Sequence, residues 1–474
     1  MTSPTKKQIR VGLLSRPRTL DPRETFDLVS AFVVSQIFET PYAPPKDGER
    51  AARPALFEGP LTTLSSGEMY AGRVRAGSRF SDGTPLTAGL VAASLQQVTE
   101  VTARATIEAR GDLVVFSLKE KNPRFDLVLT QTHAGIAIGE GDARLGTGPF
   151  MLERGSNLDR VRLVRNPHAR VAADIDEIEF VVYPPDKDGR PRALLKALGN
   201  GEVDFTSMLS RNDAASVQGM RKRFQPSNST AMLYLNCERA PLNDVRVRRG
   251  LVRAIDRVAV AAVSYSNALA FTATSLLPPS MAQSRDGIPF APDGARALLA
   301  EAGVTRAALR LVVVWAPRPY LPNPQPTAAF IAEQLAPFGF DVEIVSPANV
   351  DDFLETVDRA DYDLLLSGWI ADTPDPADFL EVNLRSDRIP SPRARSASAV
   401  NRGRLRDRAM DEALQRFRQG PTDANRDAVV ALSGELCPLL ALVHGPNIVV
   451  HAFRLHDLEV SAEGVPWFHT AKLA

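Results

Sequence analysis

The sequence contains few cysteines. Only Cys237 and Cys437 occur among its 474 residues. Two cysteines are too few for a disulfide framework or a CxxC metal site. Either the two form one bridge, or both are buried thiols that take part in no chemistry. We favour the buried thiols, because free cysteine is commonly buried in folded proteins.

A surplus of charge is also lacking. Lys and Arg number 56, Asp and Glu number 56, and the formal net charge is +0. A protein that binds nucleic acid or an anionic membrane needs a basic surplus to displace counterions from the phosphates. We therefore expect no nucleic-acid partner.

Long apolar runs are missing as well. No run approaches the roughly 18 residues that a membrane span requires. The first residues, MTSPTKKQIRVGLL, contain two lysines but no apolar segment and no small-residue cleavage site, so they do not resemble a signal peptide. Two alternatives stay open: a cytoplasmic chain, or a chain from which a leader has been removed.

Motifs for catalysis and nucleotide binding are absent from the sequence. It contains no GxxxxGK[ST], HExxH or GxSxG, and GEGDARLGTG does not fit GxGxxG. The histidines show no metal-ligand spacing. Asp372, Asp375 and Asp378 recur at every third position but do not match a calcium loop, and we interpret the last two as the start of a helix near Pro376. We expect no enzymatic activity, no metal and no cofactor.

Regular alternation of strands and helices is the clearest pattern that is present. Between residues 309 and 366, the segments LRLVVVW, DVEIVS and YDLLLS have strand character, and TAAFIAEQLAPF and VDDFLETV between them have helical character. This order predicts a βαβαβ unit with three parallel strands and right-handed crossovers. At this length, the chain should also form more than one lobe. Elsewhere the pattern predicts a helix with Asp27 near its start, a helix from Thr87, and a helix that Asp244 caps and that runs to about residue 262.

The loops after the first and third of these strands contain opposite charges. Both loops leave the carboxyl edge of the predicted sheet, where open α/β sheets bind ligands. One contains Arg318 and the other Asp372. A guanidinium recognises a carboxylate and a carboxylate recognises an ammonium, so the two together suit a zwitterion such as an amino acid or a short peptide. The alternative is that Arg318 and Asp372 pair with each other, and the pattern does not decide between the two.

Seven short segments resemble, in the same order, the motifs of the peptide/nickel-type (family 5) extracellular solute-binding proteins of ABC importers. Within that family the chain is most similar to dipeptide-binding proteins, because RPYLPNP at 318–324 resembles the RPYNPNP that precedes their GW motif. The seven segments are LDP (20–22), RFSDGTPLTA (79–88), GTGPF (146–150), GEVDF (201–205), PLNDVRVRRGLVRAID (241–256), GARALLAEAG (294–303) and GWIADTPDPADFL (368–380).

The resemblance implies a set of ligand-binding residues. By position, Arg318 would hold the peptide carboxylate and Asp372 the amino group. Tyr320 belongs to the same motif as Arg318 and is a further candidate. Trp369 either lines the cleft or packs in the core at the strand end, and Gly148 either shapes the lobe-one side of the site or forms a plain structural turn.

The resemblance also implies an α/β, two-lobe, periplasmic-binding-protein-like (Venus flytrap) fold. Lobe one would comprise residues 1–238 and 447–474, with a small subdomain inserted at about 43–145, and lobe two would comprise 239–446. The chain would cross between the lobes near 236–240 and 445–450, and two crossings would act as a hinge.

The function that the resemblance implies is capture without chemistry. The chain would be the solute-binding component of an ABC import system, which takes up a short peptide or related zwitterion in the interlobe cleft and delivers it to the transmembrane subunits of a permease. It would act as a monomer outside the cytoplasm. One alternative is a cytoplasmic solute sensor or partner protein with the same fold. Another is an enzyme acting on the same ligands, although no nucleophile–base motif supports it.

Overall fold

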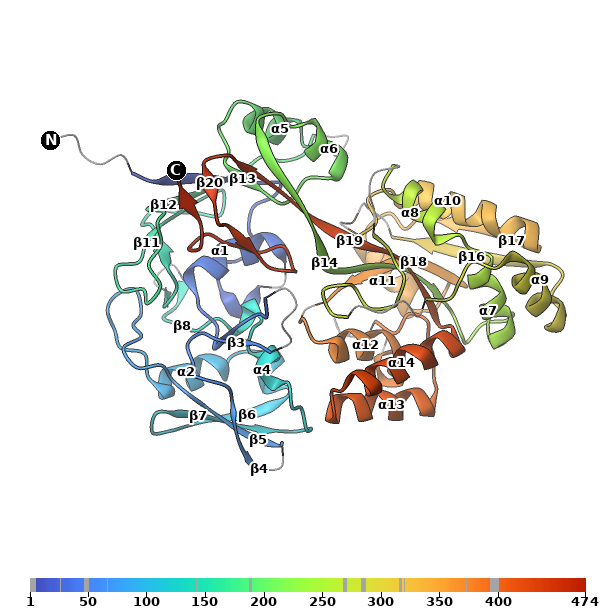
Figure 1. The fold of residues 1–474 in the computed structure, drawn as a ribbon, viewed down its shortest axis with the longest axis horizontal. Coiled ribbons are helices and arrows are strands. Elements are labelled where there is room, and N and C mark those ends of the chain that lie inside the picture. The colour runs from blue at the N-terminus through green and yellow to red at the C-terminus, as the bar shows by residue number, and fades with distance from the viewer. Residues whose placement is uncertain are drawn as a thin grey trace. The chain divides into compact units, whose positions relative to one another are not determined.

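The structure is a computed structural model with a mixed α/β fold (Figure 1). It describes residues 6–474 except 26, 47–50, 66, 142–143, 187–189, 267–270, 283–286, 315–317, 319, 372 and 393–399. The chain forms two compact units. Unit 1 comprises Met1–Gln225 and Asn447–Ala474, and unit 2 comprises Pro226–Pro446.

The chain passes between the units twice, each time inside a strand. β14 (Met220–Leu235) and β19 (Leu439–Ala452) both contribute residues to the two units. The first boundary therefore lies within β14, ahead of the residue 238 expected from the sequence, and the second lies at residue 447. The hinge role of these crossings stays a prediction.

Unit 1 is built on β1 (Gln8–Leu13), which pairs in parallel with β12 (Glu177–Val182) and β13 (Phe205–Thr206). The β1 side chains Ile9, Val11 and Leu13 are fully buried. α1 (Leu28–Ile37) begins at Asp27, whose carboxylate accepts a hydrogen bond from the Ser30 N–H. This is the helix start that the sequence predicted. The other elements around this sheet are η1 (Pro22–Glu24), β10 (Phe150–Leu152), β11 (Arg160–Arg165), α5 (Arg192–Gly199), α6 (Arg211–Ser216), β20 (Leu455–His456), β21 (Glu459–Val460), β22 (Pro466–Trp467) and β23 (Lys472–Leu473).

A second hydrophobic core in unit 1 draws its buried residues from Tyr42 to Ile136. Its four-stranded sheet has the order β4-β5-β7-β6. Thr87 caps α2 (Ala88–Leu95) by accepting a hydrogen bond from the Leu90 N–H. The limits of about 43–145 for an inserted subdomain stay a prediction. The remaining elements here are β2 (Tyr42–Ala43), β3 (Arg53–Pro54), β4 (Thr62–Ser65), β5 (Met69–Arg73), α3 (Thr99–Thr102), β6 (Ala105–Arg110), β7 (Leu113–Leu118), α4 (Phe125–Val128), η2 (Thr132–Ala134), β8 (Ala137–Ile138) and β9 (Leu145–Gly146).

Unit 2 contains the predicted βαβαβ unit. β16 (Ala307–Val313) pairs in parallel with both β17 (Phe340–Val345) and β18 (Leu364–Ile370), which confirms the expected parallel arrangement. The crossover helices are α10 (Pro324–Leu335), followed by η4 (Ala336–Phe338), and α11 (Val350–Asp358). β14 pairs antiparallel with β18 on its other side.

The remaining helices of unit 2 pack in groups: α7 contacts α9, and α13 contacts both α12 and α14. Figure 1 shows α12, α13 and α14 gathered together. The elements are α7 (Val245–Arg253), α8 (Arg257–Ser264), β15 (Phe271–Thr272), α9 (Pro292–Glu301), α12 (Pro376–Leu384), η5 (Ser386–Arg388), α13 (Arg408–Gln419) and α14 (Asp423–Leu436).

The sequence predicted one helix from Asp244 to about residue 262, and this was wrong. Asp244 does cap α7, but that helix ends at Arg253. The carboxylate of Asp256 accepts hydrogen bonds from the N–H groups of Val258 and Ala259 and starts α8. An aspartate that bonds to the following backbone favours a new helix start over continuation of the old one.

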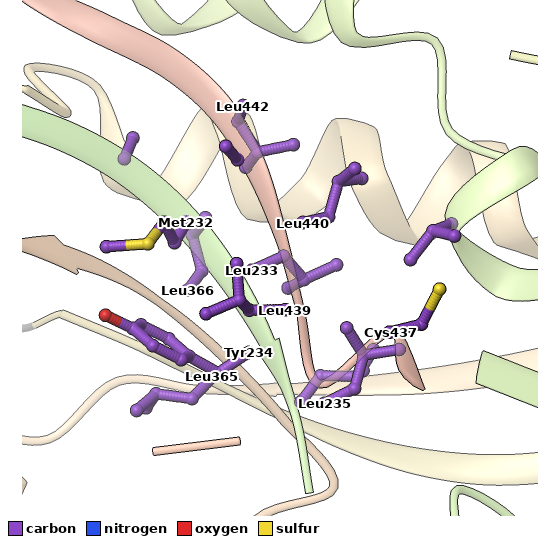
Figure 2. Close-up of a cluster of buried hydrophobic side chains, with 14 of the residues drawn as sticks. Met232, Leu233, Tyr234, Leu235, Leu365, Leu366, Cys437, Leu439, Leu440 and Leu442 are labelled. Atoms are coloured by element: carbon purple, nitrogen blue, oxygen red, sulfur yellow. The ribbon is translucent and has the colours of Figure 1, made fainter. Parts of the chain in front are cut away.

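Both cysteines are free thiols in unit 2. Cys437 is buried and belongs to the same hydrophobic cluster as the leucines of β14, β18 and β19 that Figure 2 labels. Cys237 is half-buried. Burial raises the pKa of both thiols to about 11. Both are therefore protonated at neutral pH and are weak nucleophiles.

None of the helices in the described part of the chain is both long enough and apolar enough to cross a membrane.

Candidate functional site

The carboxyl edge of the unit 2 sheet carries most of the residues predicted to bind ligand. β16 and β18 are neighbours in parallel register, with Leu311 opposite Leu364 and Val313 opposite Leu366. The chain therefore leaves both strands at the same edge. Arg318 follows β16, and the GW motif ends β18. Asp372 lies outside the described residues, so its distance from Arg318 stays a prediction.

Arg318 lies on a short, anchored turn. Its N–H donates to the carbonyl of Leu321 at 3.0 Å, and the Leu321 N–H donates back to the Arg318 carbonyl at 2.9 Å. Leu321 is fully buried in the unit 2 core. This anchor fixes the backbone of Arg318, while its side chain remains half-buried. A cation held in this way can recognise an anionic group with little loss of chain entropy.

Tyr320 packs between β18 and β19, and glycine on each strand makes room for it. A β-carbon at Gly368 would lie 2.6 Å from Cε2 of Tyr320, and one at Gly445 would lie 3.0 Å from its Cα. Burial raises the pKa of Tyr320, although the charges of Arg402 and Arg318 and a hydrogen bond with Ser367 oppose the rise. The hydroxyl is therefore neutral at physiological pH, and the ring supports the turn that carries Arg318.

Trp369 and Gly148 have well-defined surroundings. Trp369 is half-buried, lies opposite Thr230 of β14, and packs against the unit 2 core. In unit 1, the Gly148 N–H donates to the carbonyl of Ile37 at 2.8 Å, and its own carbonyl accepts from the Asn166 side chain at 2.8 Å. A β-carbon at Gly148 would lie 2.6 Å from the Ile37 carbonyl oxygen, so this turn requires glycine. Ligand contacts by Trp369 and Gly148 stay predictions.

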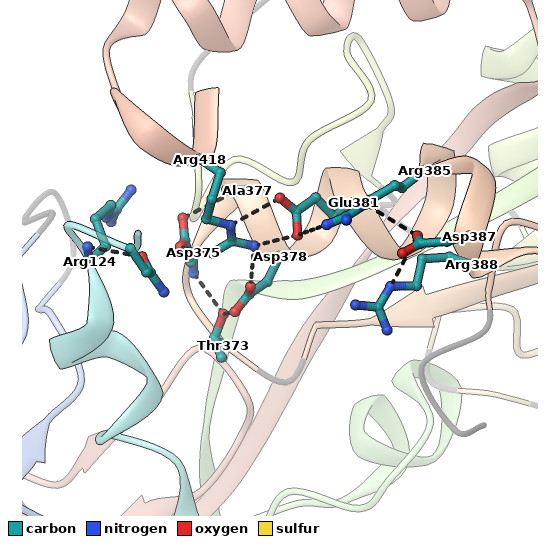
Figure 3. A network of polar contacts seen from close by, with 11 residues as sticks. Arg124, Thr373, Asp375, Ala377, Asp378, Glu381, Arg385, Asp387, Arg388 and Arg418 are labelled. Atoms are coloured by element: carbon teal, nitrogen blue, oxygen red, sulfur yellow. Dashed lines mark hydrogen bonds and ion pairs between the residues drawn. The ribbon is translucent and has the colours of Figure 1, made fainter. Parts of the chain in front are cut away.

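A buried ion-pair network fixes the segment that follows Asp372 (Figure 3). Arg418 of α13 contacts Asp375 at 3.2 Å, Asp378 at 2.6 Å and Glu381 at 2.8 Å. Thr373 donates to the other oxygen of Asp378 at 2.7 Å. Burial opposes the charge of Arg418, but the three carboxylates outweigh burial and raise its pKa. The start of α12 is thereby tied to α13.

The structure assigns different roles to the two aspartates that were interpreted as the start of a helix. Asp375 caps α12 by accepting from the Ala377 N–H at 3.0 Å, which confirms that interpretation. Asp378 lies in the first turn and binds Arg418 and Thr373 instead. Sequence reasoning missed Arg418, because it is 37 residues from Glu381 and carries no local motif.

Strands β14 and β19 carry a buried polar cluster that sequence reasoning also missed. The Thr230 hydroxyl lies 2.9 Å from Nδ1 of His444, and the Ser227 hydroxyl donates to the Gly445 carbonyl at 2.5 Å. Burial lowers the pKa of His444 to about 4, and the charge of Arg257 adds to this effect. His444 is therefore neutral at physiological pH and can donate or accept a hydrogen bond but not carry charge.

The family model "Bacterial extracellular solute-binding proteins, family 5 Middle" matches residues 51–391, which is most of the chain. The chain belongs to this family. The resemblance seen in the seven segments is thereby confirmed. The family is one of solute-binding proteins, and its fold agrees with the mixed α/β architecture described above.

Two curated relatives are similar over much of the sequence. "Di/tripeptide-binding protein 2" of Pseudomonas aeruginosa (strain UCBPP-PA14) is 27% identical over 338 residues, covering 68% of this chain and 61% of the relative. "Glutathione-binding protein GsiB" of Salmonella choleraesuis (strain SC-B67) is 26% identical over 322 residues, covering 63% and 62%. The chain therefore spans a little over three fifths of the length of these relatives.

One solved structure is similar to this chain over almost its whole length. HbpA2 from Haemophilus parasuis superimposes with a TM-score of 0.86 at 22% identity, covering 98% of this chain and 100% of that one. At this level of identity the likeness establishes a shared fold. The periplasmic-binding-protein-like fold expected from the sequence is thus confirmed over nearly the whole chain.

Proposed function

We propose that this protein is the solute-binding component of an ABC import system and that its ligand is a short peptide or a related zwitterion. The observation that carries the proposal is the family match over residues 51–391. Two relatives, 27% and 26% identical to this chain, are named for the di- and tripeptides or the glutathione that they bind. Both names describe peptides, which carry a free carboxylate and a free amine.

The charges at the carboxyl edge of the unit 2 sheet support this ligand class. In the proposal, Arg318 binds the ligand carboxylate from its anchored turn, and Asp372 binds the amino group. Tyr320 supports the Arg318 turn by packing on β18 and β19. Trp369 and Gly148 provide further contacts to the ligand. A guanidinium can bind a carboxylate through two parallel hydrogen bonds, which fixes orientation as well as adding affinity.

The remaining parts of the proposal follow from the family. The protein would act outside the cytoplasm, deliver its ligand to the transmembrane subunits of an ABC permease, and function as a monomer. It would bind its ligand and release it unchanged, without catalysis. We propose no nucleic-acid partner, because the formal net charge is +0.

Calorimetric titration with a library of di- and tripeptides tests the proposal. Arg318→Ala or Asp372→Ala should weaken peptide binding by about 2–5 kcal/mol, because each leaves one charge of the ligand unpaired in the complex. Amidating the peptide carboxylate should weaken binding to wild type much more than binding to Arg318→Ala, which has lost the guanidinium that pairs with the carboxylate. Acetylating the peptide amine should weaken binding to wild type but should not change the affinity of Asp372→Ala.

The matched control is Arg359→Ala. Arg359 is the C-cap residue of α11 in the same unit, its side chain is 69% exposed, and it pairs with Glu355 one helical turn away. Its removal should leave peptide affinity unchanged, because exposed pairs contribute little and Arg359 lies outside the proposed site. Unchanged affinity in both site variants would show that Arg318 and Asp372 are not the ligand anchors.

A further inference from the structure

Arg402 reaches the end of β18 from a separate segment of unit 2. Its Nη1 donates to the Ser367 hydroxyl at 3.1 Å and to the Gly368 carbonyl at 3.3 Å. The guanidinium carbon lies 5.9 Å from the ring centroid of Tyr234 and 5.7 Å from that of Phe353. Two strand-end groups and two aromatic rings thus fix the position of this cation.

The charge of Arg402 has no counter-ion in the described part of the chain, where no carboxylate lies within 4.0 Å of its guanidinium. Its neighbours differ, because Arg404 and Arg406 both pair with Glu238. In addition, the Nε of Arg402 is buried and has no hydrogen-bond partner among the described residues. A buried donor without an acceptor and a charge without a counter-ion both oppose folding, so these two features of Arg402 carry a cost in stability.

Arg402 and Arg318 act on the same ring. Tyr320 lies two residues after Arg318, and its ring packs on Gly368, whose carbonyl accepts from Arg402. The charges of both arginines oppose the effect of burial on the pKa of Tyr320. Two guanidinium groups therefore contribute positive potential at this end of the sheet, and in a partly buried setting such a potential is only weakly screened.

We propose that Arg402 is a specificity determinant that makes this site prefer a ligand with an anionic group next to Arg318. Arg402 acts through its charge, from behind the strand end, and does not itself bind the ligand. The inference rests on the proposed function, because it takes Arg318 to be the residue that meets the ligand carboxylate. It gives a function to a cation that has no counter-ion among the residues that the structure describes.

The test compares a free peptide with its C-terminal amide. The probe is the library peptide that binds wild type with the lowest Kd, measured by calorimetry against wild type, Arg402→Met and Arg402→Lys. Arg402→Met should weaken binding of the free acid by about tenfold and leave binding of the amide unchanged, because only the acid carries the charge that Arg402 attracts. Arg402→Lys keeps the charge and should stay within about threefold of wild type for both peptides.

Arg406→Met is the control for charge removal from the same segment. Arg406 is compensated by Glu238, so its loss should not change the ratio of the two Kd values. If the role of Arg402 were purely structural, Arg402→Met would weaken binding of the acid and of the amide equally, and Arg402→Lys would weaken both as much as Arg402→Met does. Either that result or an unchanged acid affinity in Arg402→Met would overturn the inference. Failure of every library peptide to bind wild type would instead overturn the proposed function.

Discussion

Tyr320 can lie against two strands only because the residues facing it have no side chains. Gly368 and Gly445 leave the space that its ring and backbone occupy. The RPY motif and the GW motif are separated by 47 residues in the sequence, yet one packs directly on the other. The occurrence of both motifs in one sequence therefore has a structural reason, the packing of Tyr320 on Gly368, which does not depend on a ligand.

Gly368→Ala tests this packing. The added methyl group would meet the Tyr320 ring and the Thr230 carbonyl, so the free energy of unfolding should fall by about 1–3 kcal/mol. Urea denaturation measures the change. Gly434→Ala is the control, because a β-carbon there meets nothing within 4 Å and alanine favours the α14 helix. If Gly368→Ala were as stable as wild type, the described contact between Tyr320 and β18 would be wrong.

Among the elements of unit 2, the start of α12 is held more firmly than its capping residue alone would allow. Arg418 joins three carboxylates of α12 to α13, and all four side chains are largely buried. This arrangement keeps the segment after Asp372 in one position. In the proposed site, this fixed segment would reduce the entropy that is lost when Asp372 binds a ligand.

Arg418→Met should cost about 3–5 kcal/mol of unfolding free energy, because it removes the cation that three buried carboxylates share. Chemical denaturation at pH 7 measures this loss. Arg408→Met on the same helix is the matched control: Arg408 is 92% exposed, and its pair with Glu412 should contribute less than about 0.5 kcal/mol. Equal effects of the two substitutions would contradict the network.

The elements that could be predicted from sequence are those with local signals. The βαβαβ unit has clear periodicity, and the caps at Asp27, Thr87 and Asp244 stand directly before their helices. The break before α8 was missed although Asp256 marks it, because the apolar pattern continues across the break.

Local sequence patterns predicted only some of the residues at the candidate site. Arg318 could be put forward as a candidate because it follows a strand with a recognisable period, and its role in binding stays a prediction. Arg418 and Arg402 were not found, because their partners are distant in sequence: Glu381 is 37 residues from Arg418, and Ser367 is 35 residues from Arg402. The length of β14 could not be predicted either, since its pairing with β18 is set by residues more than a hundred positions away.

At the scale of the whole molecule, both units contain histidines that are buried or half-buried and neutral at physiological pH. Burial lowers the pKa of His133 and His469 in unit 1 and of His444 in unit 2 to about 4 in each case. The unfolded chain binds protons at these positions near the ordinary value of 6.5. Between the two values the unfolded state therefore holds more protons than the folded state, and stability must fall as the pH falls.

His444 alone should account for about 2 kcal/mol of the stability lost between pH 7 and pH 5. Denaturant unfolding across this range, compared with His444→Gln, measures its share. The variant should show a shallower fall in stability with decreasing pH, because glutamine does not titrate. An identical pH dependence in the two proteins would show that His444 does not titrate in this way.

The central claim is that the chain binds a short peptide through its charged termini, and titration calorimetry of the wild-type protein tests it most directly. We predict that at least one free di- or tripeptide binds, and that amidating its carboxylate weakens binding to wild type much more than binding to Arg318→Ala. The claim would be contradicted if no peptide bound, or if the free acid and the amide bound wild type with the same affinity.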